Sequence, residues 1–149
     1  MSKKFEFEKE NLRNKALKSL KDKIDKSQSK YIADGVFRSG PRIRADSDIL
    51  LDEIINYIGE VCNLLDKYRY YITRKEISEI LKDDIYTHLL SEKNTERILK
   101  QENYREESNR IIIDKEITRY SKRYAKGIRE LFVIIVKKIL SFVIDKLYI

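Results

Sequence analysis

The chain has 149 residues, 42% hydrophobic and 38% charged, which is enough for one folded domain with a single core. One proline and four glycines leave few positions for turns and favour long helices over many short strands. A single cysteine excludes an internal disulfide, and the N-terminus has no apolar segment typical of a secretory signal. We therefore predict one all-α domain over residues 1–149, a bundle of about five helices, in an intracellular protein (cytoplasmic, or in the host cytoplasm or virion if it is viral).

The net charge of +7 is unevenly distributed along the chain. Residues 1–44 carry a net charge of +7, residues 45–107 a net charge of −6, and residues 108–149 a net charge of +6. Either basic end could bind a polyanion such as nucleic acid. The same pattern also suits self-association of a basic end with an acidic middle.

The first predicted element is a helix over residues 4–30. Its apolar residues form one narrow stripe, and lysines and glutamates fill the other faces. The stripe consists of Leu12, Leu17, Leu20 and Ile24. Because so thin a stripe buries little surface, we predict that residues 1–30 form an exposed, mobile, charged helix. Residues 31–47 hold two glycines and the only proline, and we predict a linker there that carries an arginine loop.

The clearest helix is predicted over residues 48–66, at the start of a helical core that covers 48–149. Apolar residues recur there at helical spacing: Leu51, Ile54, Ile58, Val61 and Leu65. Asp46, Ser47 or Asp48 can cap its first turn. Cys62 lies beside the apolar stripe, and we predict that it is a core residue rather than a nucleophile.

The next helix is predicted to start at Thr73. Thr73 and Glu76 match a capping box, and Ile72 and Ile77 are placed as its hydrophobic staple. A further helix is predicted over about 85–104, with a boundary near Ser91 to Thr95 whose exact position is left open, and a long last helix over about 112–148.

This last helix has a basic first half and an apolar second half. Five basic residues recur at steps of four and three and should form one row: Lys115, Arg119, Lys122, Lys126 and Arg129. Tyr120 and Tyr124 are predicted to point inward. The second half predicts an interface with a protein partner or a second copy, as in a homodimer, formed by Phe132, Ile134, Ile135, Ile139, Phe142 and Leu147. Its longest uninterrupted apolar run is six residues, too short for a membrane span.

Several kinds of catalytic chemistry lack the residues they need. His88 is the only histidine, and the glycines are isolated, so neither a histidine-based site nor a phosphate-binding glycine loop is predicted. The adjacent acids Asp83 and Asp84 are interpreted as solvated surface. We predict a non-enzymatic protein without cofactor or metal.

The stretch RIRADSDILLDEIINYIGEV resembles the first loop and central helix of archaeal histones, and YYITRKEISEIL resembles their second loop and short third helix. The resemblance covers residues 42–81, although the two loops are about six residues closer than usual. It implies a histone-fold dimer that wraps or bridges DNA. The residues that it places against phosphate are Arg42, Arg44, Tyr71, Thr73 and Arg74.

ITRKEISEILKDDIYTHLL is also similar to a helix-turn-helix whose turn would be Lys82-Asp83-Asp84. We rank this resemblance below the histone-like one, because acidic residues at the turn would repel phosphate.

Taken together, these patterns favour a small basic protein that acts in nucleic-acid transactions and binds DNA (or RNA), in an architectural or transcription-regulating role. The predicted contacts are Arg38, Arg42, Arg44, Arg74, Lys115, Arg119, Lys122, Arg123, Lys126 and Arg129. The basic row could equally be an ordinary solvated helix face. The alternative function is a regulator that docks on a large machine such as RNA polymerase and inhibits it. Size and composition are loosely similar to those of small basic helical proteins of archaeal viruses, which include DNA-wrapping coat proteins and polymerase inhibitors.

Overall fold

The computed structural model describes residues 3–33, 35, 40–68, 73–100, 103–125 and 128–147. All regular structure in these ranges is helical, which confirms the predicted all-α class. The helices are α1 (Lys3–Ala33), α2 (Gly40–Lys67), α3 (Arg74–Lys82), the π-helix η1 (Asp83–Leu89), α4 (Lys93–Leu99), α5 (Asn103–Tyr124) and α6 (Ile128–Leu147).

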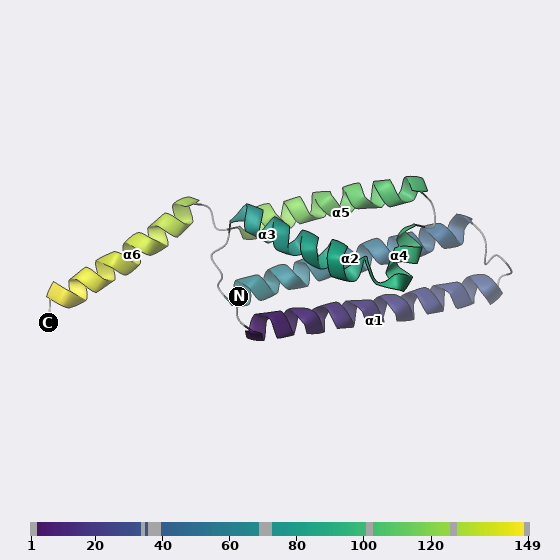
Figure 1. The fold of residues 1–149 in the computed structure, drawn as a ribbon, viewed down its shortest axis with the longest axis horizontal. Coiled ribbons are helices and arrows are strands. Elements are labelled where there is room, and N and C mark those ends of the chain that lie inside the picture. Colours follow the sequence, from purple (N-terminus) through teal and green to yellow (C-terminus); the bar gives the residue numbers. More distant parts are fainter. Residues whose placement is uncertain are drawn as a thin grey trace.

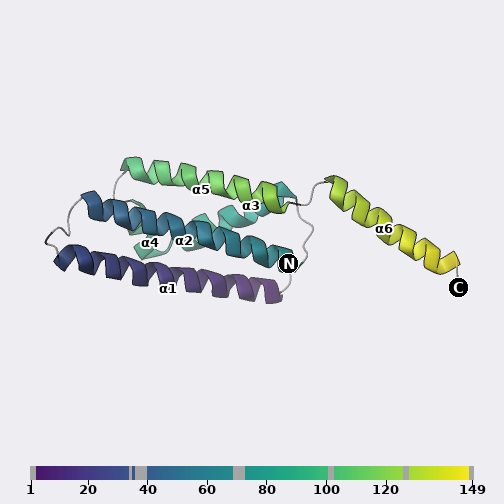
Figure 2. The same cartoon turned by 180° about the vertical axis from the view of Figure 1, so that it is seen from behind.

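The long helices α1, α2 and α5 lie alongside one another with α2 in the middle (Figure 2). The shorter α3, η1 and α4 cover the opposite face of α2 (Figure 1). Both views show α6 extending away from this bundle. The core therefore forms between two layers of helices, and none of the side chains that the structure describes in α6 belongs to it.

Helix α1 is a structural member of the bundle, which differs from the prediction of an exposed N-terminal helix. Phe5, Leu20 and Ile24 are buried, and Lys9 is almost fully buried beside them. The Phe5 ring packs edge-on against Tyr68 at a centroid distance of 6.0 Å. The apolar stripe is as narrow as predicted, but buried ion pairs supplement it. The predicted mobility of α1 stays a prediction.

The predicted linker is shorter than 31–47, because α1 continues to Ala33 and α2 begins at Gly40. Gly35 has a φ of +72°, a left-handed conformation that glycine adopts without a Cβ clash. Pro41 falls in the first turn of α2, where a helix tolerates proline. Consequently Arg42 and Arg44 belong to a helix, and the predicted arginine loop is wrong for both. Arg38 lies outside the described residues.

The apolar face of α2 forms the centre of the core, as its spacing predicted. Ile54, Ile58 and Val61 are fully buried. Cys62 is buried with them, and burial raises the pKa of its thiol to about 12, so it is a core residue. Helix α5 packs close to α2 at Gly59, where an added Cβ would lie 3.3 Å from the hydroxyl of Tyr120.

Helix α3 begins where the capping pattern predicted. The Thr73 side chain accepts a hydrogen bond from the Glu76 amide at 3.3 Å, and Ile77 is buried. The proposed staple partner Ile72 lies outside the described residues. The turn expected of a helix-turn-helix at Lys82-Asp83-Asp84 is absent, because α3 continues directly into η1. That element of the resemblance is therefore wrong.

The predicted single helix over 112–148 is two helices. α5 begins at Asn103 and ends at Tyr124, and α6 begins at Ile128. Gly127 falls between them in the sequence, and glycine is a poor helix former. The predicted boundary near Ser91 to Thr95 is confirmed, since η1 ends at Leu89 and α4 begins at Lys93. The predicted end near residue 104 is wrong, because α5 already begins at Asn103. None of the described helices combines the length and the apolarity needed to span a membrane.

Candidate nucleic-acid interface

A basic groove lies between α3 and α5, which pack against each other. It encloses about 470 Å³. Its lining consists of Arg74, Lys75, Ser78, Glu79 and Lys82 from α3 and Thr118 and Ser121 from α5. We refer to it below as the α3–α5 groove.

Helical spacing places the α3 side chains in the groove. Arg74, Ser78 and Lys82 follow one another at steps of four, so they share one face of the helix. Arg74 and Lys75 occupy the first turn after the Thr73 cap, where the helix dipole is also positive. The start of α3 therefore presents two exposed cations and the positive end of a helix dipole to the same space.

Helix α5 continues this basic surface beyond the groove. Lys115, Thr118 and Lys122 recur at steps of three and four and form one row on α5. Thr118 lines the groove. Lys115, one turn before Thr118, and Lys122, one turn after it, are exposed. The structure thus brings two predicted contacts of the last helix together with the predicted contact Arg74.

Ser121 is the unusual side chain of the groove. It is fully buried, and its hydroxyl has no hydrogen-bond partner among the described residues. A buried hydroxyl without a partner costs about 1–3 kcal/mol. Because the hydroxyl is fully buried, its missing partner is a cost of packing α3 against α5 and not a contact open to a ligand in the groove.

The cations of the groove are not neutralised by neighbouring acids. Arg74, Lys75 and Lys82 form no ion pair with any residue that the structure describes, and Glu79 is the one carboxylate in the lining. Surface cations without acidic partners attract phosphate through the summed field of the patch.

The other predicted contacts of the last helix are arranged differently. Arg119 forms an ion pair with Glu116 at 2.7 Å, and its guanidinium lies 4.7 Å from the ring centroid of Tyr120. Arg123 lies 5.6 Å from the ring centroid of Tyr124. Both arginines are exposed but sit on tyrosines that pack toward α2, as predicted for those rings. Lys126 and the side chain of Arg129 are outside the described part of the chain.

The arginines at the start of α2 are not brought together with the cations of the groove. The Arg42 side chain is largely buried and pairs with the fully buried Asp46 at 3.3 Å. Burial raises the pKa of the Asp46 carboxyl above its ordinary value. Arg44 is exposed, but it lies 23 residues before Lys67 on the same helix, or about 35 Å from the end that leads to α3. The predicted contacts Arg44 and Arg74 are therefore at opposite ends of the bundle.

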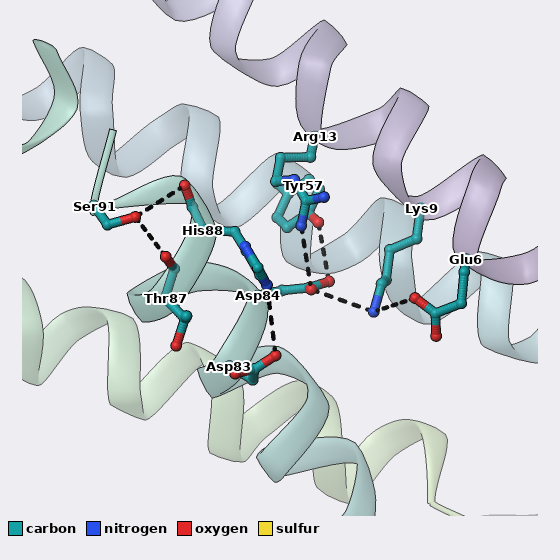
Figure 3. A network of polar contacts seen from close by, with 9 residues as sticks. All are labelled: Glu6, Lys9, Arg13, Tyr57, Asp83, Asp84, Thr87, His88 and Ser91. Carbon is teal, nitrogen blue, oxygen red and sulfur yellow. Dashed lines mark hydrogen bonds and ion pairs between the residues drawn. The ribbon is translucent and has the colours of Figure 1, made fainter. Parts of the chain in front are cut away.

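A second cluster of charge is buried between α1 and η1 (Figure 3). The Asp84 carboxylate accepts a hydrogen bond from the Tyr57 hydroxyl at 3.0 Å and pairs with Lys9 at 3.3 Å and Arg13 at 3.6 Å. Lys9 also pairs with Glu6 at 3.2 Å. Burial, with the nearby Asp84 charge, raises the pKa of the Tyr57 hydroxyl. This network fastens α1 to the second layer of the bundle, and Asp84 is not the solvated surface acid that its sequence context predicted.

Asp83, Asp84 and His88 bring potential metal ligands within 4.8 Å of one another. The carboxylate of Asp84 is already bound by Lys9 and Arg13, whose charges would repel a metal cation. Only Asp84 belongs to the buried ion-pair network, and Asp83 and His88 are exposed beside it.

Of the residues that line the groove, only Arg74 was predicted as a contact. Lys75 is the neighbour of Arg74 in the sequence. Lys82 follows Arg74 by eight residues, or two helical turns, so the helical step of four would have identified it. Ser121 gave no signal, because its burial and its missing partner depend on the packing of α3 against α5.

Searches of family models, curated proteins and solved structures found no match to this chain.

Proposed function

We propose that this protein is a non-enzymatic nucleic-acid-binding protein that holds the phosphate backbone of duplex DNA in the α3–α5 groove. The observation that carries the proposal is the convergence of Arg74, Lys75 and Lys82 on one groove without acidic partners among the described residues. Lys115 and Lys122 extend that surface along α5. Neutralisation of several phosphates by these side chains would release counterions and make binding strongly dependent on salt.

The dimensions of the groove suit a phosphate backbone. Arg74 and Lys82 are eight residues apart, which corresponds to about 12 Å along α3. One DNA strand presents a phosphate every 3.4 Å along the helix axis, so a surface of this length can contact about three of them. The lining offers lysines, an arginine and hydroxyls, which are typical of backbone contacts. The expected binding is therefore independent of base sequence and is architectural in kind.

The test is binding to a labelled duplex of arbitrary sequence at low and moderate salt. Lys75→Glu/Lys82→Glu should weaken binding at low salt by more than tenfold, because two phosphate contacts become repulsive. The matched control is Arg44→Glu/Lys93→Glu, which changes the net charge equally at two exposed positions outside the groove. Equal losses in both variants would mean that only total charge matters and would refute a site in the groove. An A-form RNA duplex of the same sequence tests whether DNA is preferred.

A second candidate function is docking on a protein such as the transcription machinery. The observation that favours it is the exposed apolar surface of α6, which needs a covering partner. Docking through an apolar face would change little with salt, whereas phosphate binding would weaken steeply. If the protein ignores duplex DNA even at low salt, this second function is favoured over the first.

A further inference from the structure

Helix α6 exposes more large apolar side chains than any other described helix. Nine of them are between 44% and 75% exposed: Phe132, Val133, Ile135, Ile139, Leu140, Phe142, Val143, Ile144 and Leu147. Together they expose on the order of 1,000 Å², more than the largest apolar patch of a typical monomer. Such a surface is characteristic of an interface.

All of these side chains except Ile144 fall in two adjacent rows that repeat as coiled-coil positions do. Phe132, Ile135, Ile139 and Phe142 follow one another at steps of three, four and three, and we call them the first row. The second row repeats in the same way and consists of Val133, Val136, Leu140, Val143 and Leu147. At about 100° per residue the two rows lie about 100° apart around the helix. A helix with two such rows is suited to pack against two neighbouring helices at once.

We propose that α6 is a self-association helix, which pairs in antiparallel orientation with α6 of a second copy of this chain through the first row. The charges beside that row favour this occupant and this orientation. Lys138 and Asp145 are seven residues apart and flank the first row on the same side. Antiparallel pairing brings this side of both helices together, so Lys138 of each copy can pair with Asp145 of the other. In a parallel pair Lys138 would instead face the apolar Val143.

The same charges select one register. When Ile139 lies across from Phe142 of the second copy, both Lys138–Asp145 pairs form. A shift by one heptad would place Lys138 beside Lys138 of the second copy, and like charges repel. The register that forms both pairs also brings Lys146 across from Ile135. The Lys146 ammonium lies 5.5 Å from the Phe142 ring centroid, so its methylene groups can cover apolar surface while the charge stays in water.

The exposed area indicates how many copies assemble. A standard stable interface buries about 800 Å² on each partner. The apolar surface of the two rows together is comparable to this area, whereas the surface of one row is smaller. One antiparallel pair would leave the second row of each helix exposed. Two such pairs can pack through their second rows into a four-helix bundle. The expected assembly therefore contains four chains. This inference does not rest on the proposed function.

The first test is the mass of the full-length protein by sedimentation equilibrium at about 50 µM. A mass of two or four chains supports the proposal, and four are expected. Ile139→Asp/Phe142→Asp should reduce the mass to one chain and leave the bundle folded, because neither side chain contributes to the core of the bundle. Circular dichroism melting of the variant checks that folding is retained. A wild-type protein that is monomeric at this concentration would overturn the proposal and would assign α6 to a different protein partner.

A charge exchange tests the orientation. Lys138→Asp alone places two acids opposite each other in the antiparallel pair, and Asp145→Lys alone places two lysines there. Each variant should therefore dissociate at concentrations where the wild type is assembled. An equimolar mixture of the two restores opposite charges at both contacts and should reassociate into mixed oligomers. Full assembly of each single variant, or a mixture that stays dissociated, would contradict the antiparallel arrangement.

Discussion

Two groups of basic side chains in this protein have different environments. Lys9 and Arg13 contact the buried Asp84, and Arg42 contacts the buried Asp46. Arg74 and Lys75 line the open α3–α5 groove and have no acidic partner among the residues described. In the first group, Lys9 and Arg13 join α1 to η1 and Arg42 forms a pair within α2, whereas the second group is available to a ligand.

A basic side chain in this protein is therefore free to bind a ligand only when it does not form an ion pair with a buried carboxylate. Arg42 and Arg74 were both predicted as phosphate contacts on the same ground, the resemblance of residues 42–81 to a histone fold. Arg42 is not free to bind a ligand, because Asp46, one helical turn later, forms a buried ion pair with it. Glu79, the one carboxylate in the groove lining, forms no described ion pair with Arg74.

The largest effect is expected from removing a buried carboxylate. Asp84→Ala leaves Lys9 and Arg13 without their buried partner and Tyr57 without its acceptor. Breaking a buried ion pair in this way costs about 3–5 kcal/mol of the free energy of unfolding. Urea denaturation measures it. The neighbouring Asp83→Ala is the control, and its effect should stay within about 0.5 kcal/mol because Asp83 is exposed.

A smaller effect is expected when one cation of the groove is neutralised. Lys75→Gln should weaken duplex binding by up to about tenfold at moderate salt and lower the slope of log affinity against log salt by about one. Arg44→Gln, the control at the far end of α2, should leave that slope unchanged. A titration of affinity against salt for both variants measures the difference, and equal slopes would remove the distinction between the two groups.

Ser121→Ala separates stability from binding. The substitution removes a buried hydroxyl that has no described partner, so the free energy of unfolding should rise by about 1 kcal/mol. Duplex affinity should stay the same, because the buried hydroxyl is not open to a phosphate in the groove. A variant that is both less stable and unchanged in binding would show that the hydroxyl has a structural partner.

The smallest effect concerns pH. Burial raises the pKa of Asp46 above its ordinary value of 3.8, so the folded state binds its proton more tightly than the unfolded state. The stability contributed by protonated Asp46 is therefore present below pH 3.8 and is lost as pH rises through the raised pKa. The difference in the free energy of unfolding between the wild type and Asp46→Asn should fall as pH rises from 3.8 through the raised pKa of Asp46. Above that pKa the difference should stay constant. Urea denaturation of both proteins at a series of pH values measures it, and a difference that grows with pH would contradict the assignment.

Local sequence determined the helical class, the cap at Thr73, the buried face of α2 and the core position of Cys62. These features depend on apolar spacing and on short-range hydrogen bonds, which neighbouring residues specify. Local sequence also indicated Lys115 and Lys122, the two lysines beside the groove, and the apolar surface of α6. The burial of Lys9 left a weaker signal, since it continues the stripe of Phe5 and Leu20 but carries a charge that suggests exposure.

Only the tertiary structure decided which charges became partners. Asp84 meets Lys9 and Arg13 across 75 and 71 residues of chain, and no local pattern specifies such a pair. The groove likewise exists only because α5 returns alongside α3. Apolar periodicity fixes which face of a helix is buried, whereas the neighbour that covers that face is set by how the whole chain packs. That is why the buried face of α2 and the start of α3 were predictable from the sequence, whereas several helix boundaries and the grouping of the charges were not.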